Sequence, residues 1–161
     1  MKTENIKIPQ LSEKEIIEHF QNASGSGRQR YPKILHEPGS EFNRVFNFMK
    51  KDSYMQPHLH PGEEKIEKMY LIKGAFAVLF FDNEGHIKRI VKLEKKKKTS
   101  IEIPAFEWHT YVMLSDEVIT YETMMGKYNP ETWKKLAIWA PAENTKESKD
   151  YLNWLKQMAL E

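Results

Sequence analysis

The segment Gln56-Pro57-His58-Leu59-His60 contains two histidines that one residue separates. Successive side chains of a β-strand point to opposite faces, so a strand here would project His58 and His60 in the same direction, about 6–7 Å apart. A third histidine, His109, follows another strand-like run much later in the chain. Neutral imidazole is the commonest protein ligand for zinc, iron, copper and nickel. The three histidines therefore indicate a metal site, although in a chain with six histidines the pair alone could also be two unrelated residues.

The composition restricts the chemistry of such a site. The 161 residues fit one domain with a hydrophobic core, and 25 lysines and arginines stand against 23 aspartates and glutamates. This near balance lacks the strongly basic character of a nucleic-acid-binding domain. The chain has no cysteine, so a metal would be held by nitrogen and oxygen ligands. Because we find neither a signal-peptide pattern nor an apolar run of about 18 residues, we expect a soluble, cytoplasmic protein without nucleic-acid or membrane partners.

Local patterns predict short strands between terminal helices. A helix is expected over residues 11–22, where Ser12 and Glu15 have the spacing of a capping box. The sequence Ala-Ser-Gly-Ser-Gly at residues 23–27 predicts a flexible break. Alternating and apolar runs then predict a series of strands over residues 42–49, 68–81 with a bend at Gly74, 87–93, 99–103, 111–113 and 117–124.

The last part of the chain is expected to be helical. Asn129 and Pro130 are typical of a helix start, and residues 150–160 show an apolar face at helical spacing. Trp133 and Trp139 are expected to pack this helical region. The predicted organisation is an N-terminal helical arm with a Gly/Ser linker at residues 1–27, a β-barrel at 28–128, and C-terminal helices packing on the barrel at 129–161.

Four consecutive lysines at residues 95–98 have two interpretations. A basic run can contact phosphate or nucleic acid. Since it lies between two expected strands, a solvated turn is the simpler explanation, and we favour it.

Two motifs resemble those of the cupin superfamily. The first consists of His58, His60, Glu67 and Gly74, and the second of Pro104, Phe106 and His109, with Phe106 where many cupins have glycine. Cupins are jelly-roll β-barrels of two antiparallel sheets that hold a divalent metal with three histidines and a glutamate, and they often dimerise. The resemblance implies an all-β-dominated fold of this kind with short terminal helices. It also implies a homodimer and one divalent transition metal (iron, manganese, nickel or zinc) bound by His58, His60, Glu67 and His109.

Further segments resemble the WbuC-type cupins, a family of cupin-fold metalloproteins associated with bacterial surface-polysaccharide genes. They are Arg28-x-Arg30, Leu35-His36, Asn43-Arg44, residues 80–85, Trp108-His109-Thr110 and residues 139–143. This resemblance covers about residues 28–156 and implies a role in surface-polysaccharide metabolism, but no particular reaction.

The carboxylate ligand has more than one candidate, because six residues separate His60 from Glu67 where cupins usually have three or four. Glu64 has the usual spacing from His60, and Glu63 is a third alternative. We favour Glu67, because Met69 and Leu71 alternate with it and would share its inner face of the strand.

Other residues are candidates for binding a small molecule. Arg28, Arg30 and Arg44 could bind an anionic group, since guanidinium pairs with carboxylate and phosphate, or they could form structural ion pairs. His36 could lie near the site or simply end a loop. Tyr111 and other aromatic residues at alternating positions are most simply explained as barrel core.

Three functions fit these patterns. The first is a metal-dependent enzyme, an isomerase or an oxygenase, that acts on a small sugar-derived or acidic metabolite. The second is a non-catalytic cupin that binds or senses a small molecule and contains a structural metal. The third is a structural protein of an assembly. A fold by itself does not choose among them.

Overall fold

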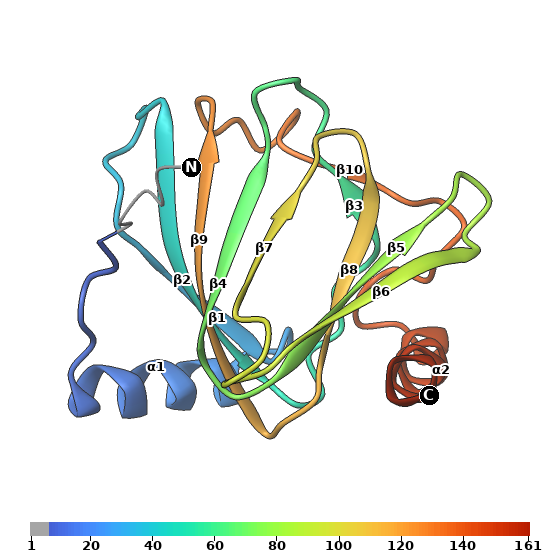
Figure 1. Ribbon diagram of the computed structural model, residues 1–161, viewed down its shortest axis with the longest axis horizontal. Coiled ribbons are helices and arrows are strands. Elements are labelled where there is room, and N and C mark those ends of the chain that lie inside the picture. The colour runs from blue at the N-terminus through green and yellow to red at the C-terminus, as the bar shows by residue number, and fades with distance from the viewer. Residues whose placement is uncertain (1–6) are drawn as a thin grey trace.

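The computed structural model of the chain describes residues 7–161, so the first six residues of the expected N-terminal arm lie outside it. Strands dominate, and a helix lies towards each end of the described chain (Figure 1). The elements are α1 (Glu13–Gly25), β1 (Arg30–Ile34), β2 (Phe42–Lys50), β3 (His58–Leu59), β4 (Glu67–Lys73), β5 (Phe76–Phe81), β6 (Ile87–Leu93), β7 (Ser100–Ile103), β8 (Trp108–Met113), β9 (Glu117–Met125), β10 (Lys135–Leu136) and α2 (Lys146–Leu160).

The strands form two five-stranded antiparallel sheets. The first sheet has the order β1-β2-β9-β4-β7 and the second the order β10-β3-β8-β5-β6. The chain crosses from one sheet to the other between β4 and β5, where Gly74 has a φ of 84°. This interleaving is that of a jelly roll. The structure thus confirms the predicted fold class, an all-β-dominated cupin jelly roll of two antiparallel sheets with short helices.

Side chains alternate between the inside and the outside of the barrel along its strands. On β5, Val78 belongs to the apolar cluster inside the barrel, whereas its neighbour Leu79 belongs to a cluster outside it. Every residue of β5 is nevertheless buried, because a helix covers the outer face of this strand. The two faces of a strand therefore belong to two different cores.

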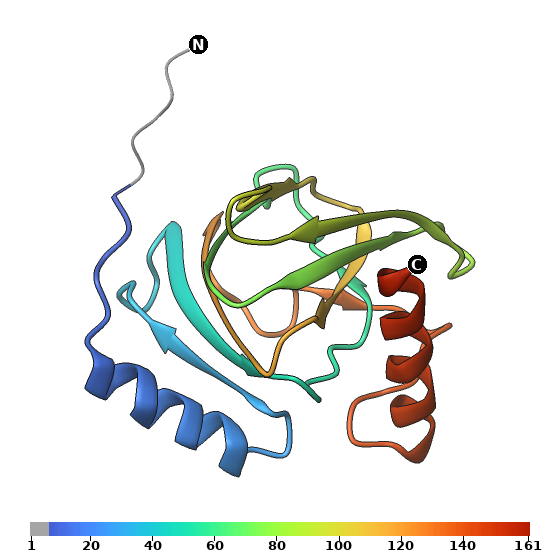
Figure 2. The same ribbon diagram turned by 60° about the horizontal axis from the view of Figure 1, so that its bottom comes forward.

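The two helices cover the outer faces of different sheets and lie on opposite sides of the barrel (Figure 2). On α1, Phe20 packs edge-on against Phe48 of β2. On α2, Leu152 and Leu155 pack over β5 and β8. Burial of apolar surface on both faces fixes the sheets in position, so the side chains inside the barrel have a rigid support. Among residues 7–161, neither helix has the length and apolarity that crossing a membrane requires.

Most of the expected elements are present. The capping box at the start of α1 forms, with Ser12 and Glu15 each bonding the other's backbone N–H. The bend between β4 and β5 and the hairpin between β5 and β6 lie where the sequence predicted them. The lysines at residues 95–98 form an exposed turn between β6 and β7, in which Lys96 has a φ of 66°. The preferred interpretation of this basic run as a solvated turn is confirmed.

Two local expectations were wrong. The helix does not end before the Gly/Ser segment, because buried Ala23 packs its last turn against the sheet and α1 continues to Gly25. Within the described residues, no helix starts at Asn129 and Pro130, and the next helix, α2, begins only at Lys146. Asn129 does cap a single turn, in which its carbonyl accepts the Trp133 N–H. The chain then pairs with β3 as strand β10, and the backbone groups that would continue a helix are used in that ladder.

The crossing at Gly74 generates a stability prediction. A Cβ on Gly74 would lie 2.2 Å from the Glu117 carbonyl oxygen, whereas a Cβ on Gly39, whose φ of 81° is similar, would meet nothing within 4 Å. We expect Gly39→Ala to reduce the free energy of unfolding by about 1 kcal/mol through backbone strain alone, and Gly74→Ala to cost at least about 3 kcal/mol through strain and steric overlap together. Urea denaturation of both variants measures the difference, and equal losses would contradict the tight crossing.

Candidate metal centre

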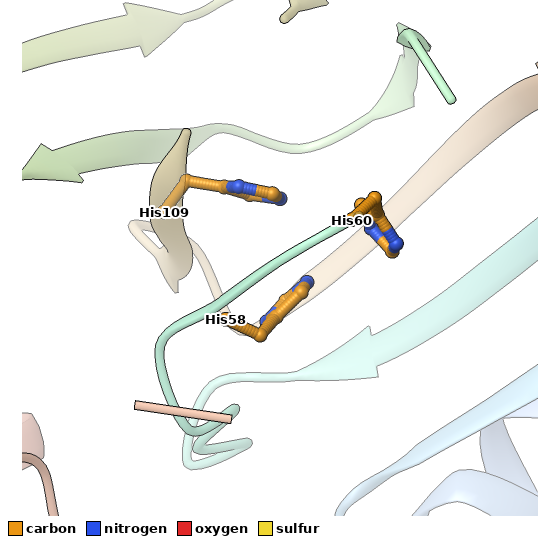
Figure 3. Close-up of side chains that lie close together, drawn as sticks. All are labelled: His58, His60 and His109. Atoms are coloured by element: carbon orange, nitrogen blue, oxygen red, sulfur yellow. The ribbon is translucent and has the colours of Figure 1, made fainter. Parts of the chain in front are cut away.

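Three imidazole rings converge inside one end of the barrel (Figure 3). His58 lies on β3, directly opposite His109 on β8, and His60 follows two residues after His58. Each ring offers a nitrogen within 4.8 Å of the others, and all three side chains are buried. Residues directly opposite in an antiparallel pair project from the same face, so the register of β3 against β8 is what brings His58 to His109.

The outer nitrogen of each ring bonds a backbone carbonyl. His58 Nδ1 lies 3.0 Å from the carbonyl oxygen of Gln56. His60 Nδ1 lies 2.9 Å from that of Trp133, and His109 Nδ1 lies 2.8 Å from that of Glu107. A carbonyl can only accept, so each Nδ1 carries the proton and donates it. In a neutral ring, Nε2 is then left with its lone pair. This fixes both the tautomer and the orientation of all three imidazoles.

Glu67 on β4 approaches the histidines from the other sheet. Its Oε2 lies 3.3 Å from Nε2 of both His60 and His109, and its Oε1 accepts a 2.6 Å hydrogen bond from the Tyr111 hydroxyl. Met69 and Leu71 follow Glu67 on the inner face of β4, as the sequence predicted. Glu63 and Glu64 are exposed, and Glu64 lies near Gly126. Among the three carboxylates considered, the structure brings Glu67 to the histidines.

Burial and mutual charge set the protonation of this cluster. Burial, with the charges of His109 and His60, holds the pKa of His58 well below its usual value. Burial alone would lower the pKa of His60, but its bond to Glu67 outweighs this effect and raises it. Burial alone would raise the pKa of Glu67, but the bonds with His109 and His60 hold it well below the usual range. Glu67 is therefore a carboxylate at neutral pH, as a metal ligand must be.

The chemistry of these donors fits a metal ion. Glu67 accepts only, and the Nε2 atoms that face it carry lone pairs when the rings are neutral. When the rings are neutral, groups of this kind repel one another in a buried site unless a cation lies between them, and without a cation the repulsion is relieved by a proton on Nε2, which the raised pKa of His60 favours. Three neutral imidazoles and one carboxylate form a nitrogen and oxygen set that suits a divalent transition metal.

A cavity of about 310 Å³ opens beside the cluster and is lined by His58, His60 and Glu67. Glu122 of β9 also lines it and lies close enough to Glu67 for the two carboxyl groups to interact. Burial and the neighbouring charge of Glu67 raise the pKa of Glu122 well above its usual value. The cavity thus contains a second carboxyl group beside the one that faces the histidines.

Two of the expected substrate-binding residues line this cavity and two do not. Arg28 and Arg30 are part of its wall. Arg44 lies on the other face of β2 from the cavity-lining Asn43 and Val45, because side chains alternate along the strand. His36 accepts a 3.0 Å hydrogen bond from the Arg44 backbone N–H through Nδ1. The structure therefore does not bring Arg44 and His36 to this cavity, which agrees with the alternative interpretations, a structural role for Arg44 and a loop position for His36.

Four residues of the site were not identified from the sequence. Tyr111 was assigned to the barrel core and Trp133 to helix packing, whereas Glu122 and Lys134 were not singled out. Tyr111 had a recognisable signal, because it follows His109 by two residues and shares its face. Glu122 is a charged residue on the inner face of β9, in register with Met69 of β4. Trp133 and Lys134 had no local signal, because they reach the site through a turn that was expected to be a helix.

Comparisons with known proteins support the fold. A crystal structure of a Shewanella oneidensis protein has a TM-score of 0.55 at 8% identity, over 65% of this chain and 72% of that one. Oxalate oxidase in complex with the substrate analogue glycolate has a TM-score of 0.54 at 10% identity, over 70% of this chain and 57% of the oxidase. CapF with the inhibitor 3-isopropenyl-tropolone has a TM-score of 0.53 at 16% identity, over 65% of this chain and 31% of CapF.

This chain spans little more than half of the oxalate oxidase and about a third of CapF. At such identities these similarities show the cupin fold and nothing of the activity. No curated protein matches the sequence. One family model, described as a domain of unknown function (DUF6016), matches residues 11–93, which run from just before α1 to the end of β6 and include His58, His60 and Glu67. The chain belongs to this DUF6016 family.

Proposed function

We propose that this protein is a metal-binding cupin in which His58, His60, His109 and Glu67 hold one divalent transition metal. The observation that carries the proposal is the hydrogen bonding of the three rings. Each donates Nδ1–H to a backbone carbonyl, which leaves every Nε2 for the centre of the cluster. Purely structural histidines would have no need of the same tautomer at three positions.

The ligand atoms limit the identity of the metal to a few transition metals but do not determine which one binds. Three imidazoles and a carboxylate suit iron, manganese, nickel or zinc, and four protein ligands leave coordination positions for a small molecule when the ion is five- or six-coordinate. A bound metal would act there as a Lewis acid that polarises a substrate oxygen.

The residues around the cluster have roles of their own. Tyr111 donates to Glu67 and so fixes the direction of its second oxygen. Trp133 holds His60 through its carbonyl and has its ring 6.0 Å from that imidazole, so it both positions a ligand and forms part of the cavity wall. Arg28 and Arg30 would orient an acidic group of the substrate.

We propose a small sugar-derived or acidic metabolite as the substrate. The charged side chains in the cavity wall, Arg28, Arg30 and Lys134, and the volume of about 310 Å³ support a small molecule with an acidic group. The motifs shared with WbuC-type cupins are the support for a role in bacterial surface-polysaccharide metabolism, and that role, a cytoplasmic location and a homodimer stay predictions.

A non-catalytic binding or sensing cupin is the second candidate. Arg30 is held by Glu143 and by the Tyr54 carbonyl, so part of the cavity wall is already fixed in the chain alone. A preorganised wall favours binding whether or not a reaction follows.

Metal content tests the proposal. Elemental analysis of the purified, untagged protein should find about one transition metal ion per chain, and the double variant His58→Ala, His60→Ala should retain almost none while remaining folded. His86→Ala is the matched control, because His86 is exposed on the turn between β5 and β6. If neither parent nor variant binds metal after incubation with iron, manganese, nickel and zinc, the proposal fails.

The choice of carboxylate is tested separately. Glu67→Gln removes the negative charge but keeps the shape, and we expect it to weaken metal binding by at least about 10-fold. Glu64→Gln, an exposed change of the same kind, should leave the affinity unaltered. Competition of each metal-free protein with a chromogenic chelator measures both affinities. If only Glu64→Gln lost affinity for the metal, Glu64 and not Glu67 would be the carboxylate ligand.

Reconstitution with single metals separates the two candidate functions. We expect the metal-loaded protein to convert at least one acidic sugar derivative and the stripped protein to convert none. Consumption of oxygen only after iron loading would identify an oxygenase, and turnover without oxygen an isomerase. Saturable binding without turnover under every metal would support the binding cupin instead.

A further inference from the structure

One wall of the cavity is markedly cationic. Arg28, Arg30 and Lys134 all line it. Glu143 interacts with all three of these cations, whereas the charge of Glu67 acts on Lys134 and that of Glu122 on Arg30. Glu143 is therefore the carboxylate that the three positive side chains have in common.

Both arginines form ion pairs with Glu143. Arg30 donates to Glu143 Oε1 at 2.5 Å, and Arg28 donates to Oε2 at 3.2 Å. Arg30 is almost completely buried and also donates to the Tyr54 carbonyl at 3.1 Å. Both oxygens of Glu143 are thus engaged, and Arg30 is fixed in place.

Lys134 is left without a close partner. Among the described residues, its ammonium group has neither an ion pair nor a hydrogen bond, although the side chain is half-buried. Burial and the charges of Arg28 and Arg30 lower the pKa of Lys134. A partly buried ammonium beside two guanidinium groups is unfavourable unless an anion joins them.

The other carboxyl groups of the cavity do not fill this role. Glu67 is bonded to His60, His109 and Tyr111. Glu122 interacts with Thr120 and Asn47. The neighbouring lysines differ from Lys134: Lys65 donates to the Thr132 carbonyl, and Lys135 is exposed with its ammonium over the Trp108 ring. Lys134 is the lysine of this turn that faces the cavity without a partner.

The position of Lys134 connects the cationic wall to the histidines. Its charge acts on His58 and His60 as well as on the arginines. The cavity of about 310 Å³ has room for roughly ten water-sized volumes, which is the size of a small metabolite. One ligand can therefore reach both the wall and the histidine cluster.

We propose that the cavity binds a small organic anion, whose carboxylate or phosphate group pairs with Lys134 beside Arg28 and Arg30, while an uncharged oxygen at its other end reaches the histidine cluster. Lys134 is the main anion-binding residue, because the arginines already share Glu143. The contact at the histidine end rests on the proposed metal site, but the anion contact at the wall does not.

Three probes of similar size test the charge requirement by calorimetry: glucose, glucuronate and glucose 6-phosphate. The metal-loaded protein should bind at least one of the charged probes at least about 10-fold more tightly than glucose, and this preference should shrink at high salt. The charged probe that binds more tightly tells carboxylate from phosphate. Equal affinity for all three probes, or no binding of either charged probe, would overturn the proposal.

Variants of the adjacent residues Lys134 and Lys135 test whether Lys134 binds the anion. Lys134→Gln should weaken the binding of the charged probe by about 10-fold or more and leave the affinity for glucose unchanged. Lys134→Arg should retain most of the affinity for the charged probe. Lys135→Gln is the matched control and should behave as the parent. Circular dichroism checks that each variant is folded. Equal affinities of Lys134→Gln and Lys135→Gln for the charged probe would overturn the assignment of Lys134 as the anion-binding residue.

The same titrations on chelator-stripped protein separate this inference from the proposed function. Metal binding without any preference for charged probes would contradict the inference and leave the metal site standing. Failure to bind metal, together with an anion preference that Lys134→Gln removes, would contradict the metal site and leave the anion site standing.

Discussion

Burying three imidazole lone pairs next to a carboxylate requires a positive charge between them. The backbone carbonyls of Gln56, Trp133 and Glu107 accept the Nδ1 protons, which leaves each Nε2 for the cluster, and those of His60 and His109 lie 3.3 Å from Glu67. In water such groups would be solvated, but here all four side chains are buried. The cost of leaving them unpaired is several kcal/mol in a low-dielectric interior. A bound cation removes that cost, which is why the site is best understood as a metal centre.

The barrel makes this arrangement possible because the helices cover part of the outer face of each sheet. The inner faces of β4, β8 and β9 hold polar groups at the end of the barrel that contains Glu67 and His109, and apolar side chains such as Met69 and Met113 further along the same strands. On the outer faces, α1 and α2 cover the sheets. His58, His109 and Glu67 thus lie on strands of the barrel, whereas His60 and Trp133 lie in the segments between strands.

The parts of the fold and site that could be predicted are those with a local periodic signal. Strand alternation identified most strands, and the spacing of His58 and His60 together with Met69 and Leu71 after Glu67 pointed to one inner face. The turn that contains Trp133 and Lys134 could not be predicted, because Asn129 and Pro130 have the local chemistry of a helix start and the pairing of β10 with β3 is a long-range interaction. The position of Arg44 differs from this case, because strand alternation, a local pattern, already puts its side chain on the face of β2 opposite to the cavity-lining Asn43.

The most direct test of the account is a crystal structure with anomalous scattering data collected on both sides of the absorption edge of the metal that the protein retains. The account predicts one anomalous peak, at bonding distance from Nε2 of His58, His60 and His109 and from a carboxylate oxygen of Glu67. A structure in which the protein has been incubated with metal, yet the four side chains surround only water and the peak lies elsewhere, would contradict it.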